Sequence, residues 1–555
     1  MSKLTADSIW LNARICTFDQ KLPWATALAV NCGKIIAVGG DQDMEPLAGP
    51  ETDLHDLAGG FVMPGLIDTH VHAIWGGIRD LFEVYVGYEA SLQDIAAAIE
   101  NKTHVLPTGT WIEGGPWRLD HLQKLSGMSP RTFLDRAAPH HPVIFTDATK
   151  HNCWVNSLAL AAVGIDENTK PPENGRIGID PDTGEPDGIL IEAASGDVRA
   201  KLTRSSEDML QAVGYARDQM HAYGITAIKE PMASEADLIA YTEADRNNKL
   251  NLHVFCHIAK RTPVREETYT MEKIAELRNQ FHSAHVRPSG VKLFLDGVAP
   301  SRTAAFLEPY GQVSPCGCTP ESFNADALLM TPPKELGKEV AELDRAGYLV
   351  KMHAVGDRAV RAGLDAIEVA RRENGYSGLR HEIAHTTFVS GSDIGRFTSL
   401  SAIAEVSPKL WFPNPITAGQ IEVLGNDRAQ RCHPIASLLG AGAEVTYGSD
   451  WPAAAPDASP WSGLSGMLTR QDATGKYPGS VGAVEAIDLK SALNIFVTNG
   501  ARAMNMENVT GRLSNGMSAD FILLDQDIFQ IEPGEISETE VEITVFEGQV
   551  VHRKF

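Results

Sequence analysis

The stretch that decides the fold is MPGLIDTHVH, residues 63–72. It continues a strand-like apolar run, allows a break at Pro64-Gly65, resumes as Leu66-Ile67 and ends in His70 and His72. Two residues apart on an extended strand, these imidazoles point to the same side. Because neutral imidazole is the commonest protein ligand for divalent transition metals, the stretch predicts a strand that presents two nitrogens to one ion. The alternative, two histidines in an ordinary loop, is weakened only if further ligands follow later strands.

The composition and net charge argue against several classes of protein. The 555 residues are 43% hydrophobic and 22% charged, and the formal net charge is −24. This charge disfavours binding to nucleic acid or an anionic membrane, and no apolar run has membrane-spanning length. The seven scattered cysteines predict reduced thiols, with Cys316 and Cys318 in a loop. We expect a cytoplasmic protein that acts on a small molecule, and a homodimer stays open.

Strand-like runs alternate with helix-like stretches through the middle of the chain, for example 205–222 and 359–374. This alternation is typical of parallel α/β architecture. Eight such units would close a TIM-like (β/α)₈ barrel, whose active site lies at the carboxyl ends of the strands. The eight expected strands are 61–67, 224–229, 251–257, 290–295, 347–353, 381–385, 401–406 and 443–449.

The two ends of the chain are rich in short β-like runs and turn signals. Residues 1–60 and 501–555 are each too short to close a good core alone, so we predict that they pair into one composite β-sandwich. The barrel domain then spans 61–500. Within it, the segment from about 85 to 190 is too long for an ordinary connection and predicts an inserted subdomain over the barrel mouth.

Further candidate ligands stand at later strand ends. His353, His385 and Asp450 each end a predicted strand. Lys292 lies inside the apolar run 291–295; it could extend to solvent or pair with Asp296. Alternatively, its desolvated amine reacts with carbon dioxide to form a carbamate, an anionic ligand able to bridge two metals.

The order His-x-His, Lys, His, His, Asp resembles the amidohydrolase superfamily. Residues 64–72, 291–297, 353–359 and 448–452, with 111–117 and 151–160 in the insertion, resemble its amidohydrolase-3 or YtcJ-like branch, which includes N-substituted formamide deformylases. The resemblance covers essentially the full chain, although Ala384 stands where an acidic residue is expected. It implies a metal-dependent hydrolase with one or two divalent ions, held by His70, His72, Lys292, His353, His385 and Asp450.

In this hypothesis His70, His72 and Asp450 hold one ion, His353 and His385 hold a second, and carbamylated Lys292 bridges them. Zinc is the first choice, although manganese, iron or cobalt suit the same donors. Without the carbamate, the site keeps one ion. Asp450 is the expected catalytic residue: it takes a proton from metal-activated water and passes it to the leaving nitrogen of an N-acyl, N-formyl or carbamate-type substrate.

Four residues are candidates for substrate contact: His151, Trp117, Glu230 and His381. His151 lies in the insertion, and Glu230 follows a predicted strand. Trp117 could wall an apolar pocket, but an aromatic side chain there is also typical of a local core. His381 faces the same side as His385 only if the strand between them is unbroken; the alternative is a packed or solvent-facing histidine.

Two other functions stay open. The same barrel and metal could serve a lyase or decarboxylase, because the fold does not determine the chemistry. A catalytically silent binding protein is the second alternative, and the complete set of strand-end ligands argues against it.

Overall fold

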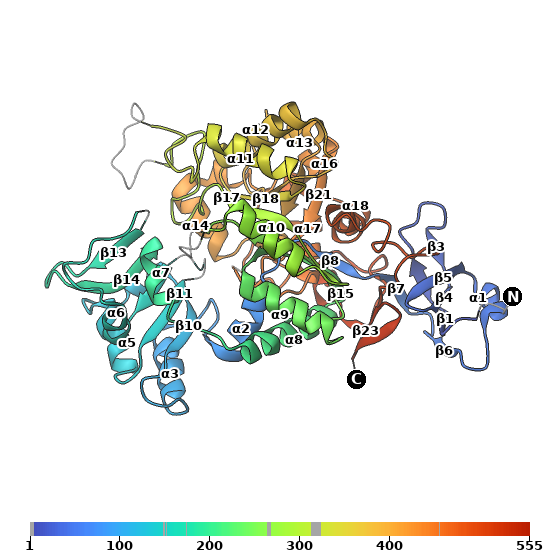
Figure 1. The fold of residues 1–555 in the computed structure, drawn as a ribbon, viewed down its shortest axis with the longest axis horizontal. Coiled ribbons are helices and arrows are strands. Elements are labelled where there is room, and N and C mark those ends of the chain that lie inside the picture. The colour runs from blue at the N-terminus through green and yellow to red at the C-terminus, as the bar shows by residue number, and fades with distance from the viewer. Residues whose placement is uncertain are drawn as a thin grey trace.

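The structure is a computed structural model that describes residues 5–147, 150, 152–173, 175–262, 268–311, 323–453 and 455–554. A central barrel lies between two β-rich parts (Figure 1). The inserted segment lies at one end of the barrel, and strands from both termini lie at the opposite end. This arrangement confirms the predicted fold class.

Eight parallel strands form the barrel sheet, in the order β21-β20-β19-β18-β17-β16-β15-β8. The seam is closed outside the strand ladder, because the Thr69 amide donates to the Tyr447 carbonyl oxygen at 2.8 Å. Each predicted strand has its observed counterpart: β8 (Leu66–Asp68), β15 (Ile225–Ala233), β16 (His253–Ala259), β17 (Val286–Phe294), β18 (Leu349–Ala354), β19 (Glu382–His385), β20 (Ile403–Val406) and β21 (Glu444–Tyr447).

Amphipathic helices cover the barrel. In α12 (Asp357–Asn374) the buried residues Ala359, Gly363, Ile367 and Ala370 recur every three or four positions, which places them on one face. In α8 (Ser206–Ala222) the N-cap Ser205 accepts from the amide of residue 208 and starts the helix. Other helices of this layer are α2 (Ala73–Phe82), α9 (Glu235–Arg246), α10 (Met271–Gln280), α11 (Pro333–Arg345), α13 (Ile394–Leu400), α16 (Ile435–Gly440), α17 (Trp461–Thr469), α18 (Leu489–Phe496) and α19 (Thr498–Ala503).

The expected single strand 61–67 is two strands that belong to different sheets. β7 (Phe61–Pro64) pairs with strands from both termini, whereas β8 pairs with β15. The chain changes sheet at Gly65, where a Cβ atom would lie only 2.2 Å from Thr226 Oγ1. A glycine therefore allows the close backbone approach that the crossing needs.

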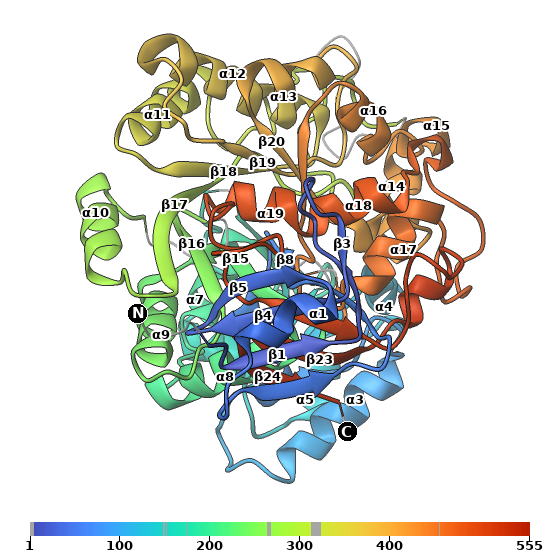
Figure 2. The ribbon, with the colours of Figure 1, turned by 90° about the vertical axis from the view of Figure 1, so that its right-hand side faces the viewer.

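Strands from both ends of the chain build the sandwich, whose four-stranded sheet faces the viewer in Figure 2. The side chains of Trp10, Leu28, Val62, Phe521 and Val545 share one buried core between the sheets. One sheet has the order β5-β4-β1-β6 and the other β24-β23-β22-β7-β2-β3. Their strands are β1 (Ser8–Leu11), β2 (Arg14–Cys16), β3 (Trp24–Ala25), β4 (Ala27–Asn31), β5 (Lys34–Gly39), β6 (Asp53–Asp56), β22 (Phe521–Leu524), β23 (Val541–Phe546) and β24 (Gln549–Arg553).

The insertion has its own six-stranded sheet, in the order β13-β14-β12-β11-β10-β9. Successive residues Ile144 and Phe145 enter different cores, as do Cys153 and Trp154, because side chains alternate across a strand. The elements are β9 (Val84–Tyr85), β10 (Ile112–Trp117), β11 (Val143–Asp147), β12 (Asn152–Val155), β13 (Gly175–Ile179), β14 (Pro186–Glu192), α3 (Leu92–Thr103), α5 (Pro130–Ala137) and α6 (Ser157–Val163).

Within the described part of the chain, no helix combines the length and apolarity needed to cross a bilayer. The five cysteines found there are free thiols. The predicted loop at Cys316 and Cys318 lies outside the described residues.

Candidate metal centre

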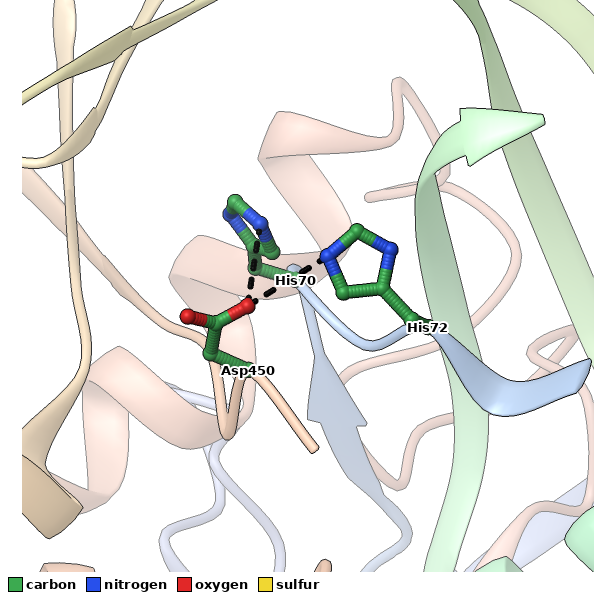
Figure 3. Close-up of side chains that lie close together, drawn as sticks. All are labelled: His70, His72 and Asp450. Atoms are coloured by element: carbon green, nitrogen blue, oxygen red, sulfur yellow. Dashed lines mark ion pairs between the residues drawn. The ribbon is translucent and has the colours of Figure 1, made fainter. Parts of the chain in front are cut away.

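Side chains from distant parts of the chain meet at the carboxyl ends of the barrel strands. His70 and His72 lie just past the end of β8, before α2, rather than on the extended strand that their spacing suggested. Asp450 follows β21, and His385 ends β19. Figure 3 shows His70 and His72, which belong to one segment, pointing toward Asp450 on another.

His70, His72 and Asp450 bring three donor atoms close together, and we call this group the tripod. Oδ1 of Asp450 lies 3.5 Å from Nε2 of His70 and 3.4 Å from Nε2 of His72. Ligands arranged tetrahedrally at about 2.1 Å from a zinc ion are about 3.4 Å apart. The donor set and its spacing therefore fit a divalent ion.

Two more histidines extend the cluster. His385 Nδ1 lies 3.9 Å from Asp450 Oδ2, and its ring centroid lies 4.7 Å from that of His70 and 4.6 Å from that of His353. His353 Nε2 lies 3.2 Å from the carbonyl oxygen of Gly297. The structure thus brings together all four histidines of the predicted ligand set.

Lys292 lies on β17 with only 1% of its surface exposed, so it does not extend to solvent. Asp296 instead accepts from the backbone amides of Ala305, Val355 and Gly356. Burial, and next the charge of Lys351, lower the pKa of Lys292 to about 7. A large fraction of this amine is therefore neutral near pH 7, the form in which it is a nucleophile.

Burial keeps two of the imidazoles at this centre neutral. It lowers the pKa of His70 and His385 well below the usual range, so their lone pairs are available to a metal. Burial lowers the pKa of His72 too, but the nearby carboxylates of Asp450 and Glu230 outweigh it and raise that pKa to about 9. Burial is also the main reason that the pKa of Asp450 is raised.

Two residues of the cluster have strained backbones. His385 has φ 69° and Asp450 has φ 56°, in the left-handed region that few non-glycine residues adopt. Such strain persists where the surrounding structure holds a side chain in one direction, and it is concentrated at functional sites. Here it turns both side chains into the cluster.

Glu230 lies beside the cluster, where its carboxylate faces His72. Its Oε1 lies 3.5 Å from Nδ1 of His72, and its Oε2 accepts from the Ala73 amide and the Tyr241 hydroxyl at 3.2 and 3.1 Å. A carboxylate on the second nitrogen of a ligating histidine orients its ring.

Trp117 and His381 lie away from the cluster, in the packed positions that were the alternative to substrate contact. Trp117 is packed in a core of the insertion, where its indole donates to the Phe145 carbonyl at 3.0 Å. His381 lies at the amino end of β19, the far end of the barrel; its Nε2 is 2.9 Å from Asp344, and its Nδ1 accepts from the Val350 amide. Hydrogen bonds to the protein thus occupy both ring nitrogens. His151 lies outside the described residues.

Two neighbours of the cluster were missed. Glu405 on β20 accepts from Nδ1 of His70 at 2.5 Å. The sequence could have indicated Glu405, because it is the one charged residue in the apolar run 402–406, just as Lys292 is in the run 291–295. Trp75 stacks on His72 with ring centroids 5.0 Å apart, and nothing in the local sequence indicated this contact.

The chain has relatives along its whole length. It is 28% identical to Protein LONG AFTER FAR-RED 3 of Arabidopsis thaliana, over 94% of this chain and 87% of the relative. It is 26% identical to Putative amidohydrolase YtcJ of Bacillus subtilis, over 99% of both chains. It is also 26% identical to N-substituted formamide deformylase of Arthrobacter pascens, over 98% of this chain and 97% of that one.

Solved structures share the fold. An uncharacterised metal-dependent hydrolase from Pyrococcus horikoshii superposes with a TM-score of 0.73 at 23% identity, over 95% of this chain and 99% of that one. The sequence profile described as the Amidohydrolase family matches residues 53–552. This match spans the barrel, the insertion and most of the sandwich, and the chain therefore belongs to the Amidohydrolase family of hydrolases.

Proposed function

We propose that the chain is a metal-dependent amidohydrolase that cleaves an amide-like C–N bond in a small molecule of N-acyl, N-formyl or carbamate type. The observation that carries this proposal is the tripod of His70, His72 and Asp450, in which the Asp450 oxygen lies 3.5 and 3.4 Å from the two imidazole nitrogens. Two relatives support it. One is named a deformylase of N-substituted formamides, and the Pyrococcus structure is described as a metal-dependent hydrolase.

Zinc is the preferred metal because the donors are imidazole nitrogens and carboxylate oxygen. His353 and His385 would hold a second ion, and Lys292 would bridge the two as a carbamate. A carbamate forms when a neutral amine attacks carbon dioxide and loses a proton. The lowered pKa of Lys292 supplies that neutral amine.

When bound, a divalent ion supplies Lewis acidity that makes water easier to deprotonate and a carbonyl easier to attack. The protein's own part is proton transfer at Asp450. One carboxylate oxygen takes the proton from the attacking water as the C–O bond forms. The same proton then goes to the departing nitrogen as the C–N bond breaks, which releases an amine and an acid. The buried position of Asp450 raises its pKa, which makes it a better base.

A panel of N-formyl amines, N-acyl amines and carbamates tests the proposal. We expect stoichiometric amine release from at least one class, loss of activity after chelation and recovery with zinc. For an amide substrate, release of carbon dioxide without a free amine would instead indicate a decarboxylase. No amine from any class with the metal-loaded protein would contradict the proposed reaction.

A further inference from the structure

Four charged side chains in the interior of the barrel form one group that the proposed reaction does not use. Lys229 on β15, Lys351 on β18, Glu382 on β19 and Glu405 on β20 are each 0% exposed. Taking charges out of water is expensive, and well-packed apolar residues often give equal or greater stability than a buried ion pair. Four charges at this depth therefore call for a reason beyond filling the barrel.

The four side chains follow one another with alternating sign. Lys229 donates to Glu382, and also to the carbonyl oxygen of Ala503 at 2.9 Å. On the other side of Glu382, Oε2 lies 3.0 Å from Nζ of Lys351, which in turn lies 3.8 Å from Oε2 of Glu405. The two lysines balance the two glutamates. We call Lys229, Glu382, Lys351 and Glu405 the charge ladder.

The upper end of the charge ladder reaches His70 at two points. Oε2 of Glu405 accepts from Nδ1 of the imidazole. Nζ of Lys351 donates to the carbonyl oxygen of Thr69, the residue before His70. The ring and the backbone that carries it are thus both held by the ladder. With its proton on Nδ1, His70 keeps a lone pair on Nε2, the atom that faces Asp450.

We propose that the charge ladder positions His70 for metal binding, and that Glu405 and Lys351 thereby determine the metal affinity of the centre. This inference rests on the proposed function. An ionised Glu405 can only accept at Nδ1, so it selects the tautomer whose Nε2 binds a metal. Lys351 holds that carboxylate in place. Glu382, which is itself paired with Lys229, balances the charge of Lys351. All four are positioning residues.

A direct role for Glu405 is the main competitor. Its carboxylate, His70 and His385 each offer a donor atom within 4.8 Å of the others, so Glu405 itself could bind the ion. Lys351 tests positioning in either case, because it has no lone pair to offer while charged. Weaker metal binding in a folded Lys351 variant would show that affinity depends on how Lys351 holds Glu405 and the Thr69 carbonyl.

The experiment measures zinc and cobalt affinity by competition with a chelator, alongside thermal unfolding, on the full chain. Glu405→Gln keeps the shape of the side chain and removes its charge, and Lys351→Met keeps the stem and removes the amine. Each should weaken metal binding by about 10- to 100-fold. Because Lys351 acts in part by holding Glu405, the loss of affinity in the double variant should be smaller than the product of the two single losses.

Asp344→Asn is the matched control, since it removes a buried carboxylate at the far end of the barrel. It should lower the unfolding temperature and leave metal affinity unchanged. Wild-type affinity in folded Glu405→Gln and Lys351→Met would overturn the inference, as would a loss confined to Glu405→Gln. If Lys351→Met does not fold, Lys351→Gln tests the same charge. Failure of the wild-type chain to bind either metal would instead contradict the proposed function.

Discussion

Replacing Asp450 by asparagine is the sharpest test of the proposed chemistry. Asparagine has nearly the same shape and keeps an oxygen at the position that lies 3.5 and 3.4 Å from the two Nε2 atoms. It removes the charge and, with it, the ability to take a proton. Because general-base catalysis contributes about 10²- to 10⁴-fold, we expect kcat to fall by that factor, or about 3–5 kcal/mol of transition-state stabilisation.

The assay pairs amine release with metal content by mass spectrometry of the purified chain. Asp450→Asn should retain most of the metal, since His70, His72 and the amide oxygen remain. Asp344→Asn serves as the control for loss of a buried carboxylate, because its side chain pairs with His381 rather than with the cluster. That control should be less stable, with normal turnover per folded molecule.

Retention of more than about a tenth of the wild-type kcat by metal-loaded Asp450→Asn would refute the reasoning, because general-base loss is worth at least about 100-fold. Loss of metal and activity together would show that Asp450 acts mainly as a ligand, and would leave the proton to another group.

Three further outcomes are expected. Lys292→Ala should lower the metal bound per folded chain, and unchanged content would argue against a bridging carbamate. A hydrogen bond to Glu547 outweighs the opposing effect of burial and raises the pKa of His285 to about 9. Charged His285 therefore stabilises the fold by at most about 3 kcal/mol. This contribution is fully present below pH 6.5 and is lost as the pH rises through 9. His285→Gln should thus lower the urea-unfolding free energy at pH 6 and have little effect at pH 10, and equal effects at both would contradict the assignment. In Gly448→Ala the new Cβ would lie 2.4 Å from Cβ of His70, so we expect about 1–3 kcal/mol of destabilisation and weaker metal binding; a variant with normal affinity would show that this packing does not position His70.

Local pattern was sufficient for the barrel and for most of the cluster. Apolar runs of strand length, separated by helix-like stretches, predict parallel βα units, and the topology of such units brings the carboxyl ends of their strands to one mouth. A histidine or aspartate at a strand end, such as His353 or Asp450, could therefore be placed without knowing its neighbours.

Contacts that depend on the pairing of distant strands could not be predicted in this way. Gly65 marks a possible break, but only the approach of Thr226 makes it the point where the chain changes sheet. Trp117 and His381 have residue types typical of a binding site, yet each is satisfied by a partner far away in the sequence.

The sequence by itself determined which residues arrive at the mouth of the barrel, because strand order and strand ends are properties of the chain's own periodicity. Only the tertiary structure decided what stands behind them: Glu230 on His72, and Glu405 on His70. Hydrogen bonds and buried charges act over a few ångströms. Their partners are thus set by strand register and packing, which no local pattern encodes.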